Sequence, residues 1–257
     1  MQKTVEHKKG ISGSALKWIA VISMLIDHVA CVLLGKILVN NGIYSVGDIS
    51  TEYIQSLIEQ GSVGFVYLAY QIMRRIIGRL AFPIFCFCLV EGFMRTGSKK
   101  KYAGRLMLFA ILSEVPFDLA FWGKGMELQH QNVFFTLLLG FLMMWGMEAV
   151  AARIKNEWLL LSGQMLLFVI TAFLAEAVAC DYGWKGIFAI MLLYLFRYQK
   201  GAQLLAGCVA FCWEPTAMLA FIPVGGYSGK RGKQNKWFFY VFYPVHLLLL
   251  YFISRLI

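Results

Sequence analysis

The sequence predicts an all-α integral membrane protein that crosses the lipid bilayer with about eight helices in a single domain over residues 1–257. Three observations predict this class. Of all residues, 60% are hydrophobic and 15% are charged, whereas about 25% are charged in soluble domains. Apolar runs of about 20 residues, long enough to span a bilayer as a helix, recur along the chain. Short clusters of Lys and Arg separate these runs, a pattern that keeps loops in the cytoplasm.

The charge balance and the cysteines argue against two other classes of protein. The formal net charge of +10 does not indicate nucleic-acid binding, because the cations lie in short clusters between apolar runs. The 6 cysteines lie within or at the end of apolar runs and form neither a CxxC pair nor a zinc spacing. We therefore expect no metal site and no nucleic-acid partner, and a multi-pass protein of the cell membrane.

The first part of the chain predicts two helices around an external loop. Residues 1–13 are polar and basic, which places the N-terminus in the cytoplasm. The first helix is predicted over residues 14–34, after a serine cap. Residues 40–62 are the longest polar stretch and indicate an external loop with one surface helix. Residues 65–73 are apolar but too short to span a membrane, so they lie at the interface or extend the second helix, predicted over residues 74–93.

Six further helices are predicted along the rest of the chain. They cover residues 102–121, residues 132–152, residues 158–180, residues 184–195, residues 204–222 and residues 237–253. With the N-terminus inside, the loop over residues 225–236, which carries four positive charges, falls outside and breaks the charge rule. Two explanations remain open: the loop binds an anion, or the sixth and seventh helices are miscounted.

Ionisable residues within the first helix are the main functional signal. Lys17 and His28 are eleven positions apart, and eleven steps of about 100° return to within roughly 20° of the same helical face. The rise between them is roughly 16 Å, so a cation near one membrane surface and an imidazole near the midplane share one face. Because ionisable side chains are costly inside a membrane, Lys17, Asp27 and His28 predict a functional site that faces the protein interior. The alternative is a lysine that reaches the head groups and a histidine bonded within the helix bundle.

Other polar residues inside predicted helices complete the candidate site. Arg79 precedes Pro83, whose missing N–H leaves the Arg79 carbonyl without its helical partner. Glu114 and Asp118 are four residues apart and share a face, either as ion-pair partners of Arg79 or as a handle for a cationic acceptor. Asn132 is either a polar contact of the site or only a helix cap.

The last helix carries two further candidates, Tyr243 and His246, beside Pro244. His246 lies near the middle of the bilayer in this prediction. It either takes part in the chemistry or bonds a backbone carbonyl that Pro244 leaves free.

Several blocks of this sequence resemble successive blocks of the TraX family, and together they extend from Lys17 to His246. They are LKWIAVISMLIDH, IIGRLAFPIFCFCLVEGF, KKKYAGRLMLFAILSEVPFDLAF, NVFFTLLLG, DYGWKGI and FFYVFYPVHL. The family's namesake is a membrane protein that acetylates the pilin N-terminus in conjugative plasmids. The family is similar in turn to the acyltransferase-3 and heparan-glucosaminide acetyltransferase group, which often has Arg, ten residues and His in its first helix. Lys17 and His28 match that spacing with a different cation.

This resemblance implies an acyl-CoA-dependent acetyltransferase (an acyltransferase) with acetyl-CoA as the acyl donor. A basic cytoplasmic surface, with Lys17 and residues 99–101, would hold the phosphates, and the acetyl group would reach His28. Acyl transfer needs a base and donors for the developing oxyanion. With this chemistry, our hypothesis assigns His28 as the base and Asp27 as the group that tunes or orients it. The alternative is that Asp27 pairs with Arg79 or Lys17 instead. Tyr243, His246 and Arg79 are the candidates for the oxyanion or the acceptor.

The acceptor and the route of transfer stay open at this stage. A peptide amine, a sugar hydroxyl or a sugar amine of the cell envelope would fit, and transfer is either direct or through an acetyl-histidine. The alternative function is a small proton-coupled membrane transporter, because charged residues and prolines break several helices. Its path would use His28, Asp27, Glu91, Arg79, Glu114 and Asp118. No two-fold internal repeat is visible, which disfavours the transporter, and the sequence says nothing of the oligomeric state.

Overall fold

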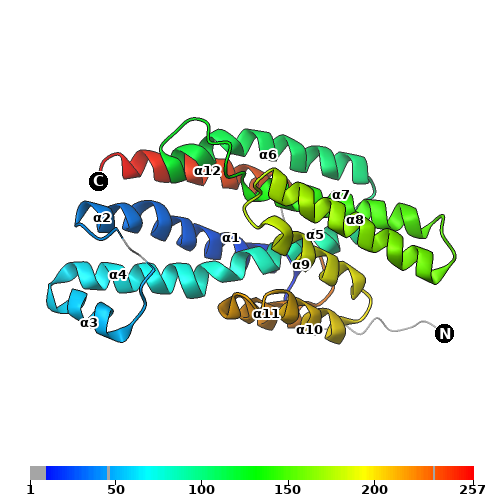
Figure 1. Cartoon of the computed structure of the whole chain (residues 1–257), viewed down its shortest axis with the longest axis horizontal. Helices are drawn as coiled ribbons and strands as arrows, with labels where there is room; N and C mark the ends of the chain where they lie inside the picture. Colours follow the sequence, from blue (N-terminus) through cyan, green and yellow to red (C-terminus); the bar gives the residue numbers. More distant parts are fainter. Residues whose placement is uncertain (1–9, 45–46, 234) are drawn as a thin grey trace.

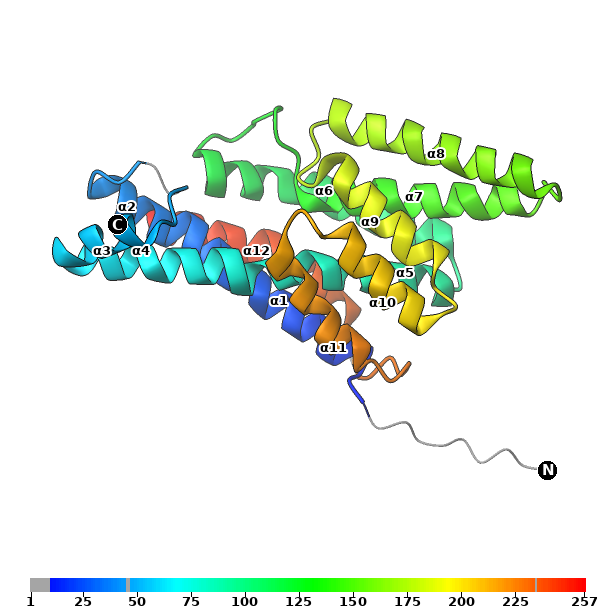
Figure 2. The ribbon, with the colours of Figure 1, turned by 60° about the horizontal axis from the view of Figure 1, so that its bottom comes forward.

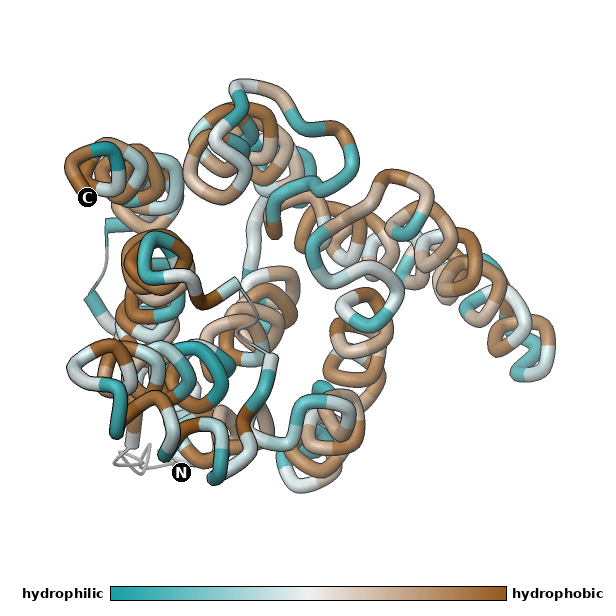
Figure 3. Tube along the Cα trace, turned by 60° about the vertical axis from the view of Figure 1, so that its left-hand side comes forward, coloured by the Kyte–Doolittle hydropathy of each residue, from teal (hydrophilic) through white to brown (hydrophobic). Residues whose placement is uncertain are grey.

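The computed structural model describes residues 10–44, 47–233 and 235–257, and the basic residues 1–9 lie outside the described residues. Within these ranges the regular elements are all helical, which confirms the all-α class, and the long helices run along one axis of the molecule (Figure 1). Figure 3 shows apolar residues along the helices, with hydrophilic residues gathered mainly in the connecting loops. Five described helices are long and apolar enough to cross a membrane: Gly13–Asn40, Ser62–Arg95, Val133–Ala151, Glu157–Ala177 and Trp237–Ser254.

Two long helical rods form the centre of the fold. The first consists of α1 (Gly13–Val29), a π-helical turn (Ala30–Leu34) and α2 (Gly35–Asn40). After the short helix α3 (Thr51–Glu59), the second rod consists of α4 (Ser62–Ile72), a π-helical turn (Met73–Ile77), a 3-10 turn (Gly78–Leu80) and α5 (Ala81–Arg95). The apolar residues 65–73 therefore extend the second predicted helix, which was one of their two expected placements.

The two rods contact each other closely at the 3-10 turn before Pro83. Because Pro83 has no N–H, the helix cannot be regular here. The Ser23 hydroxyl of α1 donates to the carbonyls of Ile77 and Gly78, the latter at 3.3 Å, and so satisfies two carbonyls of the irregular segment. A Cβ atom at Gly78 would overlap the Asp27 carboxylate, so a glycine is needed for the rods to approach at this level.

The remaining helices surround these rods. They are α6 (Lys99–Trp122), α7 (Val133–Ala151), α8 (Glu157–Ala177), α9 (Gly183–Leu195), α10 (Lys200–Ala210), a 3-10 turn (Pro215–Ala220), α11 (Phe221–Gly225) and α12 (Lys236–Ser254). Figure 2 shows α8 at the margin of the molecule. Its exposed residues include Trp158, Leu159, Leu161, Met165, Leu166, Val169, Ile170, Phe173 and Leu174. A 21-residue helix with so much exposed apolar surface is suited to face lipid rather than water.

The predicted seventh span over residues 204–222 is a hairpin rather than a crossing helix. α10 ends at Ala210, and the chain turns back before Pro215. Gly207 lies against the Phe221 ring, and the Lys200 ammonium donates to the Tyr227 carbonyl at 3.1 Å. The hairpin therefore returns the chain to the end of the molecule from which α10 started.

This hairpin places the loop over residues 226–235 beside the start of α1. The backbone N–H of Ile11 donates to the Gly226 carbonyl at 2.8 Å, and the N–H of Gly13 donates to the Lys230 carbonyl at 2.8 Å. We call this end of the molecule the basic end. It comprises residues 10–13, residues 95–101, residues 152–156, residues 196–200, residues 226–233 and residue 235. The expected exception to the charge rule is thus removed: the sixth predicted helix is present as α9, but the seventh predicted span is a hairpin.

The start of α1 and the end of α12 lie at opposite ends of the molecule, which differs from an eight-span prediction (Figure 1). Lys36 of α2 donates to the Ser254 carbonyl, and Asn40 donates to the Ile257 carbonyl at 3.3 Å. The last residues of α12 therefore lie beside the far end of the first rod. We call this the distal end. An even number of membrane crossings would have placed the last residues of α12 at the basic end instead.

The hairpin makes a test of the fold possible. A Cβ atom at Gly207 would overlap the ring of the buried Phe221, whereas one at Gly201, on the same helix, would meet open space. We expect Gly207→Ala to lower the free energy of unfolding by about 1–3 kcal/mol through overpacking. Gly201→Ala is the control and should be neutral or slightly stabilising. Thermal unfolding in detergent checks this, and equal melting temperatures for the two variants would contradict the close packing of α10 on α11.

Candidate functional site

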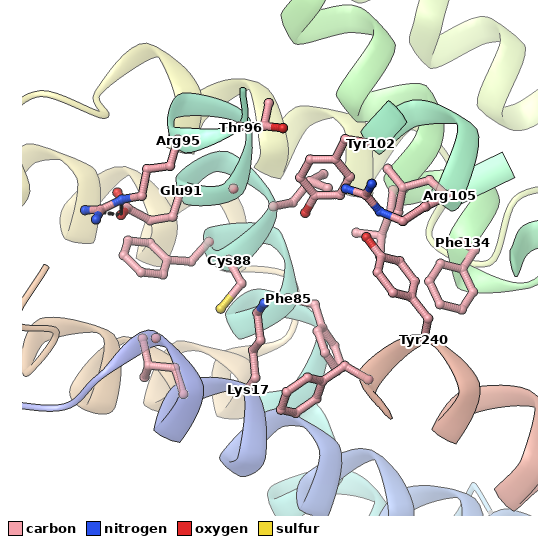
Figure 4. A pocket seen from close by; sticks show the side chains of 18 of the residues that line it. Lys17, Phe85, Cys88, Glu91, Arg95, Thr96, Tyr102, Arg105, Phe134 and Tyr240 are labelled. Carbon is pink, nitrogen blue, oxygen red and sulfur yellow. Dashed lines mark hydrogen bonds and ion pairs between the residues drawn. The ribbon is translucent and has the colours of Figure 1, made fainter. Parts of the chain in front are cut away.

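A pocket of about 370 Å³ opens at the basic end and is walled mainly by α1, α5, α6 and α12 (Figure 4). We call it the basic pocket. Most of its wall is apolar or aromatic, and its charged lining residues are Lys17, Glu91, Arg95, Arg105 and Arg231. Four cations against one carboxylate give the pocket a net positive charge. Figure 4 shows Lys17 and Arg105 on facing walls of the cavity.

The single carboxylate of the basic pocket is engaged at its rim. Glu91 Oε2 lies 2.9 Å from Arg95 Nη2, and it accepts a hydrogen bond from the Tyr227 hydroxyl at 3.0 Å. Burial and the neighbouring Glu91 carboxylate raise the pKa of Tyr227 to about 12, so this phenol stays protonated and keeps donating. Because Glu91 is already paired, an anionic ligand in the pocket would meet little opposing charge.

A pair of histidines lies next to residues that line the basic pocket. Met24 and Tyr243 line its inner part, and His28 lies one helical turn beyond Met24. His28 Nδ1 lies 2.7 Å from His246 Nε2. The two rings are parallel to within 4°, with centroids 5.0 Å apart, so they meet edge to edge through this hydrogen bond. The pair joins the first rod to α12 near the middle of both helices.

The backbone determines which nitrogen of each histidine carries a proton. His246 Nδ1 lies 2.8 Å from the Phe242 carbonyl, which can only accept, so the hydrogen-bond network assigns a proton to that nitrogen. In a neutral ring His246 Nε2 is then the acceptor, and His28 Nδ1 must donate to it. His28 Nε2 is left with a free lone pair. The arrangement therefore leaves an unprotonated nitrogen on His28, a ring that packs against Tyr243 of the basic pocket.

Tyr243 is placed to donate a hydrogen bond beside His28. Its ring centroid lies 6.0 Å from that of His28, and the side chain is 3% exposed. Tyr243 and Val133, the first residue of α7, both line the basic pocket. The tyrosine hydroxyl has one O–H donor, which can donate into the pocket.

The profile of the TraX family, described as TraX protein, matches residues 12–254. The chain belongs to the TraX family. It is also 32% identical to the probable fimbrial assembly protein FimC, serogroup H1, of Dichelobacter nodosus over 212 residues, which are 68% of this chain and 80% of that protein. No solved structure matches this chain. The matched range of the TraX profile includes the basic pocket and both histidines.

In this TraX-family chain Asp27 does not orient His28. Its carboxylate points toward Gly78, and its Oδ1 atom is buried without a hydrogen-bond partner. The alternative pair of Asp27 with Arg79 is not formed within 4 Å, because Arg79 Nε lies 3.5 Å from Glu214 Oε1. Adjacent helical residues point about 100° apart, so Asp27 lies on the side of the second rod while His28 lies on the side of α12. The orienting group of His28 is His246.

The predicted acidic pair and Asn132 hold the start of α7. Asp118 Oδ2 accepts from the Glu127 N–H at 2.7 Å, and Glu114 accepts from the Asn132 amide. Asn132 in turn caps α7 by accepting from the Phe134 N–H at 3.0 Å. Asn132 is thus a helix cap, and the expected ion pair of Glu114 or Asp118 with Arg79 is wrong, because Arg79 pairs with Glu214. By fixing the start of α7, these residues position Val133, which lines the basic pocket together with Tyr243.

Arg95, Arg105, Arg231 and Glu214 were not predicted as site residues. Arg231 belongs to the loop for which anion binding was one explanation. These four residues reach the site from distant parts of the sequence, so no local pattern could find them. No cluster of three or more His, Cys, Asp or Glu suited to a metal ion occurs in the described part of the chain.

Proposed function

We propose that this TraX-family chain is a membrane-embedded acetyltransferase that transfers an acetyl group from acetyl-CoA to an amine or hydroxyl of an envelope acceptor. The observation that carries the proposal is the basic pocket whose lining residue Tyr243 packs against the His28–His246 pair, in which His28 Nε2 is free to accept a proton. The family membership and the similarity to a probable fimbrial assembly protein support an acceptor in the cell envelope.

The chain spans the cell membrane several times, with the basic end in the cytoplasm. Five described helices have the length and composition to cross, and the loops of the basic end carry most of the Lys and Arg clusters. Such clusters keep loops on the cytoplasmic side. The basic pocket then opens toward the compartment that contains acyl-CoA, and the distal end faces the outside.

Acetyl-CoA fits the basic pocket in two parts. A volume of about 370 Å³ is near the lower limit of small-molecule pockets, roughly 300–1,000 Å³, and suits the thin pantetheine arm rather than the nucleotide. The phosphates would lie at the rim near Arg95 and Arg231, with Lys17 and Arg105 further in. Arg105 Nε is buried without a hydrogen-bond partner, which an anionic oxygen would supply. Of the residues 99–101 expected to hold phosphate, Lys99 pairs with Glu148 instead.

The chemistry of His28 and Tyr243 follows from their hydrogen bonds. His28 Nε2 removes the proton from the acceptor amine or hydroxyl as the nitrogen or oxygen forms a bond to the acetyl carbon. The Tyr243 hydroxyl donates to the carbonyl oxygen as negative charge develops on it. The carbon–sulfur bond then breaks, the electron pair leaves with the sulfur of CoA, and the proton held by His28 is released to that thiolate. His246 acts only by position: its acceptor nitrogen takes the hydrogen bond from His28 Nδ1 and so holds the imidazolium of His28 in place.

A direct assay tests this function. The purified protein in detergent is incubated with radiolabelled acetyl-CoA, with and without an extract of the cell envelope, and free CoA thiol and labelled acceptor are measured together. We expect CoA release that depends on both the protein and the extract, with one labelled product for each CoA released. Absence of CoA release with active extracts from several growth conditions would contradict an acetyltransferase.

The second candidate, a proton-coupled transporter, rests on one observation. Arg79 and Glu214 form an ion pair at the tip of the hairpin, close to Asp27, at a depth where charges often mark ion paths. Reconstituted vesicles with a pH-sensitive dye distinguish the two functions. A proton flux that does not need acetyl-CoA would favour the transporter, whereas CoA release from solubilised protein would not be expected of one.

A further inference from the structure

A second pocket of about 400 Å³ lies at the distal end. We call it the distal pocket. Its walls come from the first rod, α4, the end of α6 and the end of α12, and they include Cys31, Lys36, Tyr70, Phe121, Tyr251 and Arg255. No function has been given to it so far. Its position matters because α1 and α12, which carry His28 and His246, both continue into its walls.

The distal pocket approaches the histidine pair from the side opposite to the basic pocket. Phe121 lines it, and the Phe121 ring packs edge-on against His28 with the centroids 5.3 Å apart. Cys31, also in its wall, lies 4.0 Å from the Asp27 carboxylate. Tyr243 of the basic pocket and Phe121 of the distal pocket both pack against the His28 ring, with centroids 6.0 Å and 5.3 Å away. His28 therefore lies between the two pockets, one aromatic ring away from each.

The helix that forms one wall of the distal pocket is irregular at the pocket itself. Cys31 and Val32 belong to the π-helical turn between α1 and α2, and both line the cavity. A π-turn inserts an extra residue into the helix and is found frequently at functional sites. Here the extra residue changes the direction in which the side chains after His28 point.

The charged residues that line the distal pocket are both cations, Lys36 and Arg255. Lys36 donates to the Ser254 carbonyl at the end of α12, which uses one of its three donors. Arg255 is exposed and carries five donors in a planar fork that matches phosphate. Arg74 donates a hydrogen bond to the hydroxyl of Tyr70, a lining residue of the distal pocket, and its positive charge offsets the negative charge of Asp27. This lining favours an anionic ligand.

The distal pocket is also rich in aromatic side chains with hydroxyl groups. Tyr44, Tyr70 and Tyr251 line it together with Phe121. The flat apolar face of a pyranose packs on such rings, while tyrosine hydroxyls bond the sugar hydroxyls. The acidic pair that was expected to attract a cationic amine holds the start of α7 instead, as described above. Aromatic rings next to cations are what a phosphorylated sugar requires.

We propose that the distal pocket is the acceptor site and that it takes a sugar bearing a phosphate, presented from the side opposite to the acyl donor. This inference rests on the proposed acetyltransferase function. A sugar hydroxyl would lose its proton to His28 Nε2 and form an ester bond to the acetyl carbon, while the carbon–sulfur bond breaks and CoA leaves with that proton. The phosphate would lie between Lys36 and Arg255.

Binding without any acyl donor tests the site separately from the reaction. The full-length protein in detergent is titrated calorimetrically with glucose 1-phosphate, glucose and inorganic phosphate. We expect glucose 1-phosphate to bind at least about tenfold more tightly than either of the others, and Arg255→Ala to weaken it about tenfold or more. The control Lys124→Ala, an exposed cation at the same end outside the pocket, should bind like the wild type. Equal weakening by both variants would overturn the site.

A second experiment with lipids distinguishes a sugar-phosphate site from a site for ordinary lipid head groups. The protein is placed in nanodiscs that contain either phosphatidylinositol, which carries a phosphate and a ring, or phosphatidylglycerol, which carries only the phosphate. Competition with glucose 1-phosphate by phosphatidylinositol alone supports the proposal, and equal competition by phosphatidylglycerol overturns it in favour of a lipid head-group site.

If CoA release with envelope extract is unchanged in Arg255→Ala of wild-type melting temperature, the acceptor site is wrong while the acetyltransferase stands. If sugar phosphate binds but no CoA is ever released, the proposed function fails instead.

Discussion

His28→Ala is expected to lower the rate of CoA release by about 10²–10⁴-fold, which is the usual contribution of a positioned general base. The imidazole is the one group beside the inner end of the basic pocket for which the hydrogen-bond network of the described residues assigns a free nitrogen lone pair. The loss should fall on kcat, with little change in the KM for acetyl-CoA, because His28 lies beyond the part of the pocket proposed to hold the donor. Initial rates of thiol release with saturating envelope extract measure it.

The chain offers a matched control for this variant. His130 lies in the loop before α7, is exposed, and stacks on Trp122 with ring centroids 4.6 Å apart. His130→Ala should keep the wild-type rate. His28→Ala with a wild-type melting temperature and more than a tenth of the wild-type rate would remove the base assignment.

His246 should behave as a positioning residue and give an intermediate loss. His246→Gln keeps an amide oxygen that can accept from His28 Nδ1, so it should retain more activity than His246→Phe, which cannot accept at all. If both variants lose the same activity, the hydrogen bond is not what orients His28, and packing alone would explain the role of His246.

The class of the fold and most helix positions follow from hydropathy alone, and the reason for the exceptions is physical. Helices that cross a bilayer must be long and apolar, so α1, α7, α8 and α12 are found within a few residues of their predicted bounds. The hairpin of α10 and α11 is equally apolar, and hydropathy cannot distinguish it from one span. The break at Glu214-Pro215 was visible, but only the packing of Gly207 on Phe221 shows that the chain reverses there.

The candidate site was predictable only where a residue is unusual by itself. A lysine, an aspartate and a histidine inside an apolar helix stand out in any sequence, and so does His246 beside Pro244. Which of them meet could not be predicted, because His28 and His246 are 218 positions apart. The Pro244 explanation for His246 also needed coordinates, since its partner is the Phe242 carbonyl, whereas the carbonyl that Pro244 leaves free is four residues back, at Tyr240.

The hairpin and the histidine pair have one joint consequence for the mechanism. Because the hairpin returns the loop over residues 226–235 to the basic end, Arg231 joins Lys17, Arg95 and Arg105 around one pocket. Had the loop been on the far side, the donor site would have lost its rim and the charge rule would have been broken. The same topology leaves α12 running from the basic pocket past His246 to the distal pocket, so one helix contributes to both pockets and to the reacting group between them.

The double variant Lys17→Ala/Arg105→Ala is expected to reduce kcat/KM for acetyl-CoA by about 10²–10³-fold, mainly through KM. Hydrogen bonds to charged groups contribute about 1.5–3 kcal/mol each, so the loss of two cations from facing walls weakens an anionic ligand strongly. Each single variant should lose about tenfold or more, and the wild-type KM should rise with ionic strength because exposed rim charges are screened. Saturation curves for acetyl-CoA at two salt concentrations measure these effects.

A control variant at a neighbouring cation distinguishes binding inside the pocket from attraction by the overall charge of the basic end. Arg153 lies in the loop between α7 and α8, is exposed and does not line the pocket. If long-range attraction by the whole basic end recruits the donor, Arg153→Ala should raise KM as much as Lys17→Ala does. If the donor occupies the pocket, only Lys17→Ala and Arg105→Ala should raise it, and their effects should persist at high salt, where surface charges are screened but contacts inside the pocket are not. Equal effects of Arg153→Ala and Lys17→Ala would therefore move the donor site away from the His28–His246 pair.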